Sequence, residues 1–547
     1  MPTSKSLWAR SMNRIFGGSI SSPVPTKGRQ GRRRTRRLVL ETLENREVFA
    51  ADFDSALGVG NATGSSQARD VAVDAAGNSY LTGSFTGTTD FDPAKTHLGN
   101  TDILTAQGGT DAFVAKYAPD NSLIWVKRMG GTDSDAGGRI AIDGSGSVYV
   151  TGWFTGTGDF GSVNLSSTGL LDGYVSKLNA SGSTMWAKRW GAEGTNDSGF
   201  GVAVDATGNV YASGQRSYAL YPNAGGIEVL KFSPSGSTVW TKWVNTRSRI
   251  GGDLAVDAAG SVVVAGSFNG TVDFDPGQNI RNVSSGATEA TFVLKLTTKG
   301  AFSWVSPYVS LSTSSLVTAN TLALDSGGNI IVGGQYDGSV DFDPSNGTTT
   351  LPIGGGGVIT KLSSTGALVW AKAVESDKIA AVDGLAVDAL DSIYATGGFN
   401  GTVDLDPGAG LQTRTSAGSF DIFALKLGPD GNFVWGTTIG GTSFDYGRGI
   451  AIDNAGTVYL AGFYKGTVDF DPDPIDAHWL VNPGTFANLY LLKLKQSGSA
   501  PLATAATPGT PTATELTKNA IGTLDEQMAA WSPELLESSD TRAKRRR

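Results

Sequence analysis

The chain has 547 residues, a formal net charge of −8, 75 glycines and no cysteine. Without cysteine it can form no disulfide, no thiolate metal site and no cysteine nucleophile. No run of 18 apolar residues occurs, so the sequence predicts no transmembrane helix.

Charge is distributed unevenly along the chain. The first 50 residues hold 11 Lys or Arg and three Glu, and Thr541–Arg547 holds five basic residues and no acid. Removing these two ends from the total leaves a net charge of −21 on residues 51–540. A body this acidic repels nucleic acid and anionic lipid. We therefore expect no nucleic-acid partner and interpret the basic ends as tails or sorting signals.

A repeated phrase organises the chain. An apolar–Ala–apolar–Asp sequence recurs seven times at intervals of 52 to 69 residues, the length of a four-stranded propeller blade with one long loop. Its copies are Val71–Asp74, Ile140–Asp143, Val202–Asp205, Leu254–Asp257, Leu322–Asp325, Leu385–Asp388 and Ile450–Asp453.

Each unit predicts four strands, which we call a to d in chain order. The phrase forms strand a, a Gly/Asn turn leads to strand b, a long connection follows, and strands c and d form a second hairpin. A Gly follows the strand-a Asp by nine residues in all seven units, whereas the b–c connection varies. The sequence predicts an all-β fold, a seven-bladed β-propeller over residues 53–498. Its variable b–c and d–a connections open on one face.

The last unit needs a strand d from elsewhere. Six units have a Trp nine residues after the strand-c Lys, but the seventh has Leu502 there. Phe53 precedes Gly58 by five residues, as Trp125 precedes Gly130. We expect Phe53–Gly58 to supply strand d of the last blade and close the ring, with a strand near Leu502 as the alternative.

Two resemblances to known families follow. Units such as Ile140–Gly191, which contains AIDGSGSVYVTGWFTGTGDFG, resemble the bacterial SBBP β-propeller repeats. This implies an extracellular or surface-exposed propeller of mostly unassigned function. Residues 36–52, RRLVLETLENREVFAAD, resemble the N-terminal export segment of planctomycete surface proteins, although Val48-Phe49 depart from it. Residues 1–52 are thus expected to be a basic leader or export segment; a merely basic disordered leader is the alternative. Residues 499–547 read as an Ala/Thr/Pro linker and a disordered basic tail, with anchoring as an alternative.

Acidic turns of the type GTVDFDP recur in the b–c connections. Alternate carboxylates on an extended segment point the same way and could bind calcium, but calcium needs six to eight oxygens and Pro interrupts the usual loop spacing. We favour turn caps, with calcium as the alternative cofactor. These residues are also the loop-face binding candidates: Asp90, Asp92, Asp273, Asp275, Asp341, Asp343, Asp404, Asp406, Asp469 and Asp471.

Other polar residues give little support for catalysis. The repeated strand-a Asp and strand-c Lys are interpreted as structural because every blade carries them. Only His97 and His478 are present, which excludes a three-His metal site and supplies a Ser-His-Asp arrangement poorly. The sequence shows no non-repeated acid/base cluster in the central funnel. We predict no catalytic residues and a bacterial extracellular or cell-surface protein that binds a protein or glycan; a carboxylate-based hydrolase or lyase is the alternative.

Overall fold

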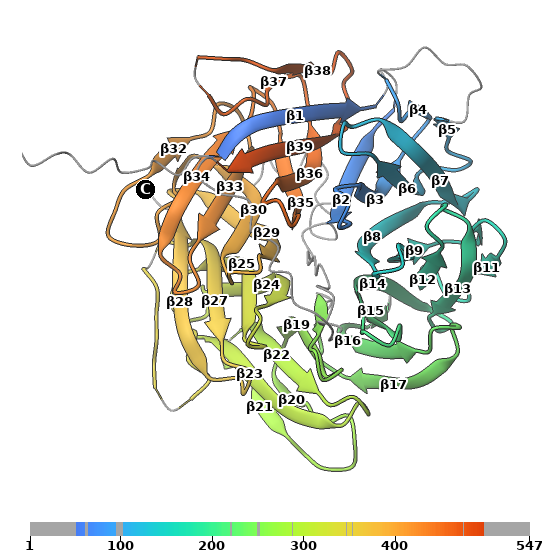
Figure 1. The fold of residues 1–547 in the computed structure, drawn as a ribbon. Helices are drawn as coiled ribbons and strands as arrows, with labels where there is room; N and C mark the ends of the chain where they lie inside the picture. The colour runs from blue at the N-terminus through green and yellow to red at the C-terminus, as the bar shows by residue number, and fades with distance from the viewer. Residues whose placement is uncertain are drawn as a thin grey trace, which may run out of the picture. The chain divides into compact units, whose positions relative to one another are not determined.

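The computed structural model describes residues 51–60, 64–93, 102–218, 221–248, 252–286, 288–345, 347–352, 354–473 and 475–496. Regular structure in these residues is entirely β, and they include no helix that could cross a membrane. Seven four-stranded antiparallel blades surround a common centre (Figure 1). The chain is therefore the seven-bladed β-propeller that the repeat predicts.

Strand a of each blade lies innermost and contacts strand a of the next blade around the ring. Blades 1 to 4, with strands in order a to d, are β2 (Ser66–Val73), β3 (Ser79–Phe85), β6 (Asp111–Tyr117), β7 (Leu123–Gly131); β8 (Asp135–Ile142), β9 (Val148–Phe154), β12 (Asp172–Leu178), β13 (Thr184–Trp190); β14 (Thr195–Val204), β15 (Val210–Tyr218), β16 (Tyr221–Phe232), β17 (Thr238–Val244); and β18 (Leu254–Val256), β19 (Val262–Phe268), β22 (Ala290–Leu296), β23 (Phe302–Ser310). Blades 5 to 7 are β24 (Leu316–Leu324), β25 (Ile330–Asp337), β27 (Gly356–Leu362), β28 (Leu368–Glu375); β29 (Ile379–Val387), β30 (Ile393–Asn400), β33 (Asp421–Leu427), β34 (Phe433–Ile439); and β35 (Tyr446–Ile452), β36 (Val458–Tyr464), β39 (Asn488–Gln496), β1 (Ala51–Val59).

Short strands in the b–c connections add a second layer of structure that the sequence reading treated as loop. These strands are β4 (Thr88–Asp90), β5 (Ile103–Thr105), β10 (Thr157–Asp159), β11 (Asn164–Ser166), β20 (Thr271–Asp273), β21 (Asn282–Ser284), β26 (Val340–Asp341), β31 (Thr402–Asp404), β32 (Thr413–Thr415), β37 (Thr467–Asp469) and β38 (Trp479–Val481). Some of them reach the neighbouring blade: β10 pairs with strand d of blade 1, and β26 with strand d of blade 4.

The hydrophobic core lies between blades, since most of its clusters combine side chains from two adjacent sheets. The strand-d Trp joins blades as predicted. Trp125 donates from Nε1 to the carbonyl of Ala180 in the c–d turn of the next blade, at 3.1 Å. A Cβ on Gly182 in that turn would lie 2.8 Å from the Trp125 ring, so glycine is needed there.

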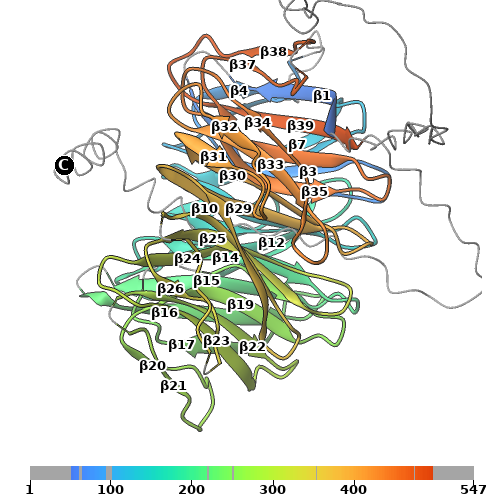
Figure 2. The same cartoon turned by 90° about the vertical axis from the view of Figure 1, so that its left-hand side faces the viewer.

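The N-terminal strand closes the ring. Strand β1 pairs antiparallel with β39, and the two ends of the chain's fold lie side by side in Figures 1 and 2. The predicted register was wrong by two residues. Lys493 pairs with Ser55, as Lys116 pairs with Trp125, so Ser55 and not Phe53 occupies the Trp position. The bulge between Phe53 and Ser55 recurs in the other c–d hairpins and does not cause the offset; Ser55 precedes Gly60 by five residues, as Trp125 precedes Gly130, so Gly60 and not Gly58 is the matching glycine.

The next blade compensates for the missing Trp. Its c–d turn has Asn121, with φ 66°, where the turn of blade 2 has Gly182. Asn121 donates from Nδ2 to the Ser55 hydroxyl at 3.0 Å, so a polar contact replaces the Trp–Gly contact at this junction. Leu502 lies outside the described residues, and β1 holds the strand-d position that it would have taken.

We expect deletion of residues 51–60 to lower the stability of the whole ring, because it removes strand d from blade 7 and exposes two strand edges. Thermal unfolding monitored by circular dichroism measures the effect. Deletion of residues 500–547 is the control and should change the melting temperature little. Greater damage from the second deletion would contradict closure by β1.

Candidate functional site

The first Asp of each repeated pair caps its own turn. In all five pairs its Oδ1 accepts the backbone N–H of the second Asp over 2.9 to 3.1 Å. In four pairs the same oxygen also accepts an N–H eight or nine residues later, from Arg281, Thr349, Gln412 and His478. The first residues of the pairs are Asp90, Asp273, Asp341, Asp404 and Asp469.

The second Asp caps the turn that follows it. In four pairs its Oδ1 accepts the N–H two residues later, over 2.8 to 2.9 Å. These hydrogen bonds lower the pKa of Asp343, where the donors are the hydroxyl and N–H of Ser345. The second residues are Asp92, Asp275, Asp343, Asp406 and Asp471. The pairs lie in five separate blades and are not brought together into one site.

The residue between the two Asp explains why the motif repeats. It is fully buried in every copy, as Phe91, Phe274, Phe342, Leu405 or Phe470. The Phe91 ring lies 5.0 Å from Phe113 and 5.6 Å from Phe85, measured between centroids. Each hairpin is thus anchored by one apolar side chain and shaped by two capped turns. No group of three or more His, Cys, Asp or Glu in the described residues is placed to hold a metal ion; calcium binding stays a prediction.

The repeated strand-a Asp and strand-c Lys lie near the opposite face and contact each other. Asp74 Oδ1 accepts the N–H groups of Ala76 and Asn78, and its Oδ2 accepts the Tyr80 hydroxyl at 3.0 Å. Lys116 lies 3.6 Å from Asp74 and over the Tyr80 ring. The same Asp–Lys ion pair recurs in blades 3 to 6. These residues hold the turns together in each blade.

The expectation that the central funnel holds no cluster of non-repeated acidic and basic residues is wrong. Five blades contribute charged residues to the channel that are not repeated from blade to blade. They lie just before the repeated phrase and are Asp70, Arg139, Asp253, Asp383 and Arg448. The sequence did not predict this cluster, because β-bulges in strand a change the regular alternation of inward and outward side chains at these positions.

Two of these carboxylates connect neighbouring blades. Asp70 accepts the N–H of Val71 at 2.8 Å and that of Ile140, in blade 2, at 2.9 Å. Asp253 accepts the N–H of Leu254 at 2.8 Å and that of Leu322, in blade 5, at 3.0 Å. Both oxygens of each carboxylate are therefore used to hold successive inner strands, which is a structural role. Arg139 lies 3.6 Å from Asp253.

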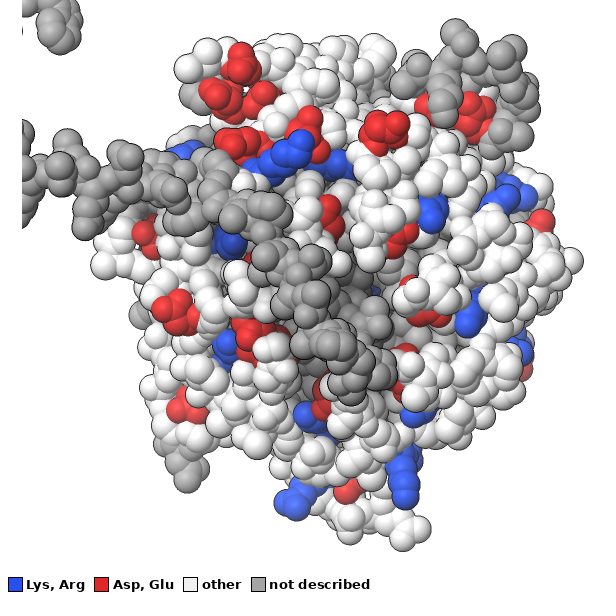
Figure 3. Space-filling view, in the orientation of Figure 1, with Lys and Arg blue, Asp and Glu red and all other residues white. Residues whose placement is uncertain are grey.

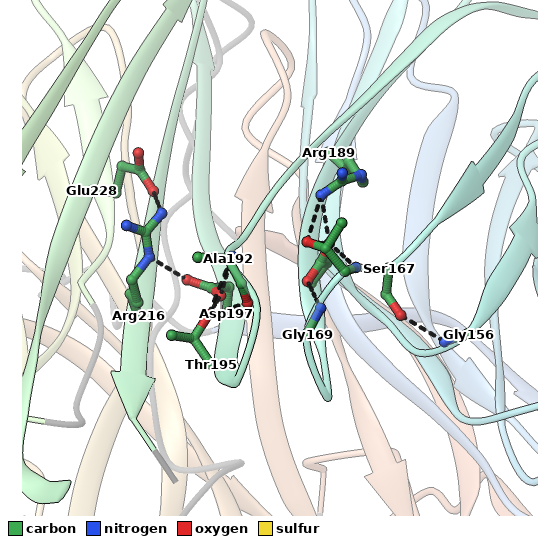
Figure 4. Close-up of polar contacts among 11 residues, drawn as sticks. Gly156, Ser167, Gly169, Arg189, Ala192, Thr195, Asp197, Arg216 and Glu228 are labelled. Atoms are coloured by element: carbon green, nitrogen blue, oxygen red, sulfur yellow. Dashed lines mark hydrogen bonds and ion pairs between the residues drawn. The ribbon is translucent and has the colours of Figure 1, made fainter. Parts of the chain in front are cut away.

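Blade 3 departs from the repeat. It has a plain hairpin, β15–β16, in place of the Asp-pair ribbon. Two residues after its strand-b Gly it has Arg216, where the other six blades have an aromatic ring. Arg216 binds Asp197 and Glu228 at 2.9 Å each (Figure 4). Its guanidinium carbon also lies 5.2 Å from the centroid of the Trp243 ring. The charges of Arg216, Asp197 and Glu228 are therefore paired with one another within this blade.

Buried carboxylate pairs occupy three blade junctions. One acid begins strand c and the other lies at or within two residues of the start of strand a of the next blade; the pairs are Asp111/Asp135, Asp172/Asp197 and Asp421/Asp445. Arg128 binds Asp111 and Arg189 binds Asp172, each at 2.8 Å. At the third junction Thr438 stands at the matching register position. Burial raises the pKa of Asp421, and raises that of Asp445 to about 6.

Exposed apolar side chains gather in the b–c connection of blade 7. Ile475, Trp479, Val481 and Phe486 are 89%, 59%, 61% and 51% exposed. Trp479 and Val481 share the outer side of β38, because alternate residues of a strand point the same way. On the face seen in Figure 3, Lys and Arg are interspersed with Asp and Glu. The other exposed large apolar side chains are spread over several blades, so this connection holds the largest group of them among the described residues.

The described residues contain one of the two histidines, His478. The His478 ring lies 4.8 Å from the Phe53 ring, between centroids, which places it against strand β1. His97 lies outside the described residues, as do the leader and the tail.

Comparison with known proteins supports the assignment of this chain as a β-propeller repeat protein. No family model matches the chain. It is 22% identical over 412 residues to an uncharacterized WD repeat-containing protein of Acanthamoeba polyphaga mimivirus, covering 60% of this chain and 29% of that protein. It is 28% identical over 289 residues to the regulatory protein FlaEY of Caulobacter vibrioides, covering 47% of this chain and 29% of that protein. The chain thus spans less than a third of either relative, and neither description names an enzymatic activity.

Solved structures give weaker likenesses. A chain of the mitotic checkpoint complex has a TM-score of 0.38 at 10% identity over 82% of this chain and 95% of that chain. A Bacteroides caccae protein of unknown function has a TM-score of 0.31 at 11% identity over 60% of this chain and 89% of that one. Scores this low carry no argument about function.

We expect the double substitution Asp273→Asn and Asp275→Asn to leave stability nearly unchanged, because Asn can still cap a turn. Differential scanning calorimetry with EDTA or with millimolar calcium measures the effect, and neither addition should move the melting temperature of the unsubstituted chain. A calcium-bound folded state would gain about 2.7 kcal/mol at a hundred times the dissociation constant. A calcium-dependent rise that the double substitution diminishes would show that the pairs are ligands.

Stability should fall as pH rises from 5 to 8. Burial raises the pKa of Asp253 to about 8 and that of Asp70 to about 6. The folded protein therefore holds protons that the unfolded chain releases near pH 4, and this stabilisation is lost as pH passes the folded-state values. Asp253→Asn should reduce the slope of the urea unfolding midpoint against pH. Asp273→Asn, on an exposed turn, is the control and should leave that slope unchanged. Equal slopes in all three proteins would rule out Asp253 as a contributor.

Proposed function

We propose that the chain is an exported, surface-associated, non-enzymatic propeller that binds an extracellular protein or a glycan through its loop face. The observation that carries this proposal is the group of exposed apolar side chains on the blade 7 connection, Ile475, Trp479, Val481 and Phe486. Trp is enriched at the energetic centres of protein interfaces, and exposed aromatic rings also stack on sugars. Export rests on the resemblance of the N-terminal segment to planctomycete export segments.

The hairpin is positioned firmly enough to serve as a binding surface. Val468 and Phe470 on and after β37 are fully buried, so its inner side is fixed to the blade. Leu480, between the exposed Trp479 and Val481, packs against the core of blades 6 and 7. A rigid hairpin with an apolar outer side loses little conformational freedom when it binds a partner.

A hydrolase or lyase is less well supported. Asp70 and Asp253, the channel carboxylates with the most altered pKa, each spend both oxygens on backbone N–H groups. A catalytic base must instead reach a substrate proton. The binding role is therefore the function that we favour.

We expect the double substitution Trp479→Ser and Val481→Ser to weaken binding at least about tenfold, since central interface residues dominate affinity. The full-length chain would be screened against a glycan array and bacterial envelope extracts, and affinity for the captured ligand measured by surface plasmon resonance. Met185→Ser with Val239→Ser is the matched control, because these exposed apolar residues lie on strands d of other blades. Unchanged affinity after the blade 7 substitutions, or equal loss in the control, would contradict the proposal.

A further inference from the structure

Two blade junctions of this protein are built from matching parts, and one of them lacks a cation. At the junction of blades 1 and 2, Asp135 accepts the N–H of Gly131 at 2.6 Å and that of Thr155 at 3.0 Å. At the junction of blades 6 and 7, Asp445 accepts the corresponding N–H groups, from Gly441 at 2.7 Å and from Lys465 at 2.9 Å. The strand-c acids of the two pairs also have the same environment: Asp111 Oδ2 accepts a loop N–H at 3.0 Å, and Asp421 Oδ2 accepts one at 2.8 Å.

The difference lies in strand d. Arg128 pairs in register with Phe113 and binds Asp111, whereas the residue in register with Phe423 is Thr438. At the junction of blades 2 and 3, Arg189 holds the same register position and binds Asp172. In the described residues, no Lys or Arg forms an ion pair with Asp421 or Asp445. Two buried carboxylates without a cation are costly to keep ionised.

Asp421 lacks the contact that Arg128 makes with Asp111. Asp111 Oδ2 accepts both a loop N–H and Arg128 Nη1, whereas Asp421 Oδ2 accepts the N–H of Ala417. Asp421 is 5% exposed, and its Oδ1, like that of Asp111, is buried without a hydrogen-bond partner among the described residues. Gly440 leaves room for this carboxyl group, because a Cβ there would lie 2.2 Å from Asp421 Cγ. Buried acceptors of this kind normally have a donor.

Only the third pair has an aromatic residue directly before each of its acids. Phe420 and Phe444 directly precede its two acids, where the first junction has Thr110 and Ser134. The Phe444 ring is partly exposed and stacks on Phe463, with centroids 5.6 Å apart and an angle of 2° between the planes. The Arg448 guanidinium already lies over the Tyr446 and Phe463 rings of this stack, at 5.1 Å and 5.8 Å from the ring centroids. Carboxylates beside a partly exposed aromatic ring suit a second planar organic cation, which can form bidentate hydrogen bonds and stack at once.

We propose that Asp421, Asp445 and Phe444 form a binding site for a guanidinium group, supplied as an arginine side chain by a partner protein. The arginine takes the place that Arg128 and Arg189 fill at the other two junctions. This inference deepens the proposed function and rests on it, because the site adjoins the blade 7 hairpin: Gly441 contacts the carboxylate of Asp445 and also lies against Thr467 of β37.

The site can be tested without the partner. Argininamide is titrated into the full-length chain by calorimetry, with citrullinamide, which has the same shape but no charge, as the control ligand. We expect argininamide to bind with one site and to raise the melting temperature, and Asp421→Asn to weaken it about tenfold. Thr438→Arg should raise the melting temperature and abolish binding, because it supplies the cation from within the chain.

Junction 1–2 supplies a matched control. Arg128→Thr should create a second argininamide site that is weaker than the first, because Ser134 stands where the third junction has Phe444. Equal binding of citrullinamide, or binding that survives both Asp421→Asn and Thr438→Arg, would overturn the proposal. If Thr438→Arg does not fold, Asp421→Asn alone decides.

The arginine could also come from the basic ends of the chain itself. A full-length variant with the Lys and Arg of residues 1–50 and 541–547 changed to Ser separates the two sources. Binding by this variant but not by the unsubstituted chain would assign the arginine to the chain's own ends, and binding by neither would overturn the site. Argininamide binding that persists after Trp479→Ser and Val481→Ser, while partner binding does not, keeps the cation site and the proposed function distinguishable.

Discussion

Contact between successive inner strands is the constraint on which the rest of the structure depends. Seven strands a must pack against one another around a closed ring, so each blade has to offer its neighbour nearly the same surface. The residue before the repeated phrase shows how narrow this contact is. A Cβ on Gly449 would lie 2.8 Å from the backbone nitrogen of Val71, and Asp70 binds the corresponding nitrogen, that of Ile140. In blades 7 and 1 this position therefore holds either no side chain or one that bonds to the next strand.

The same constraint separates structural residues from candidates for function. The Asp pairs, the Asp–Lys ion pairs and the strand-d Trp recur because every blade needs its turns capped and its neighbour contacted. Apart from the channel charges, which come from five blades, most of what remains lies in blades 6 and 7: an exposed apolar hairpin, a carboxylate pair without a cation, and a stack of aromatic rings. Blade 3 is also singular, but Arg216 satisfies its acids from within the blade.

Much of the fold could be predicted because repeat spacing reports strand pairing directly. The constant interval from strand-a Asp to strand-b Gly fixed seven hairpins, and the absent seventh Trp pointed to the N-terminal strand. The register of that strand was predicted wrongly, since Phe53 precedes Gly58 by the same five residues that separate Ser55 from Gly60. Asn121, where blade 2 has Gly182, was the available signal that no Trp packs on that turn. The carboxylate pairs escaped notice because their members lie on different blades, and only three-dimensional register reveals that Thr438 corresponds to Arg128.

Site-specific photocrosslinking tests most directly whether binding belongs to the singular surface of blade 7. A photoreactive phenylalanine analogue would replace Trp479 in one full-length chain and Val239, an exposed residue on strand d of blade 3, in another. After irradiation with envelope extract, the account predicts a discrete crosslinked product from position 479 and none from position 239. A product from position 239 alone, or the same products from both, would contradict it.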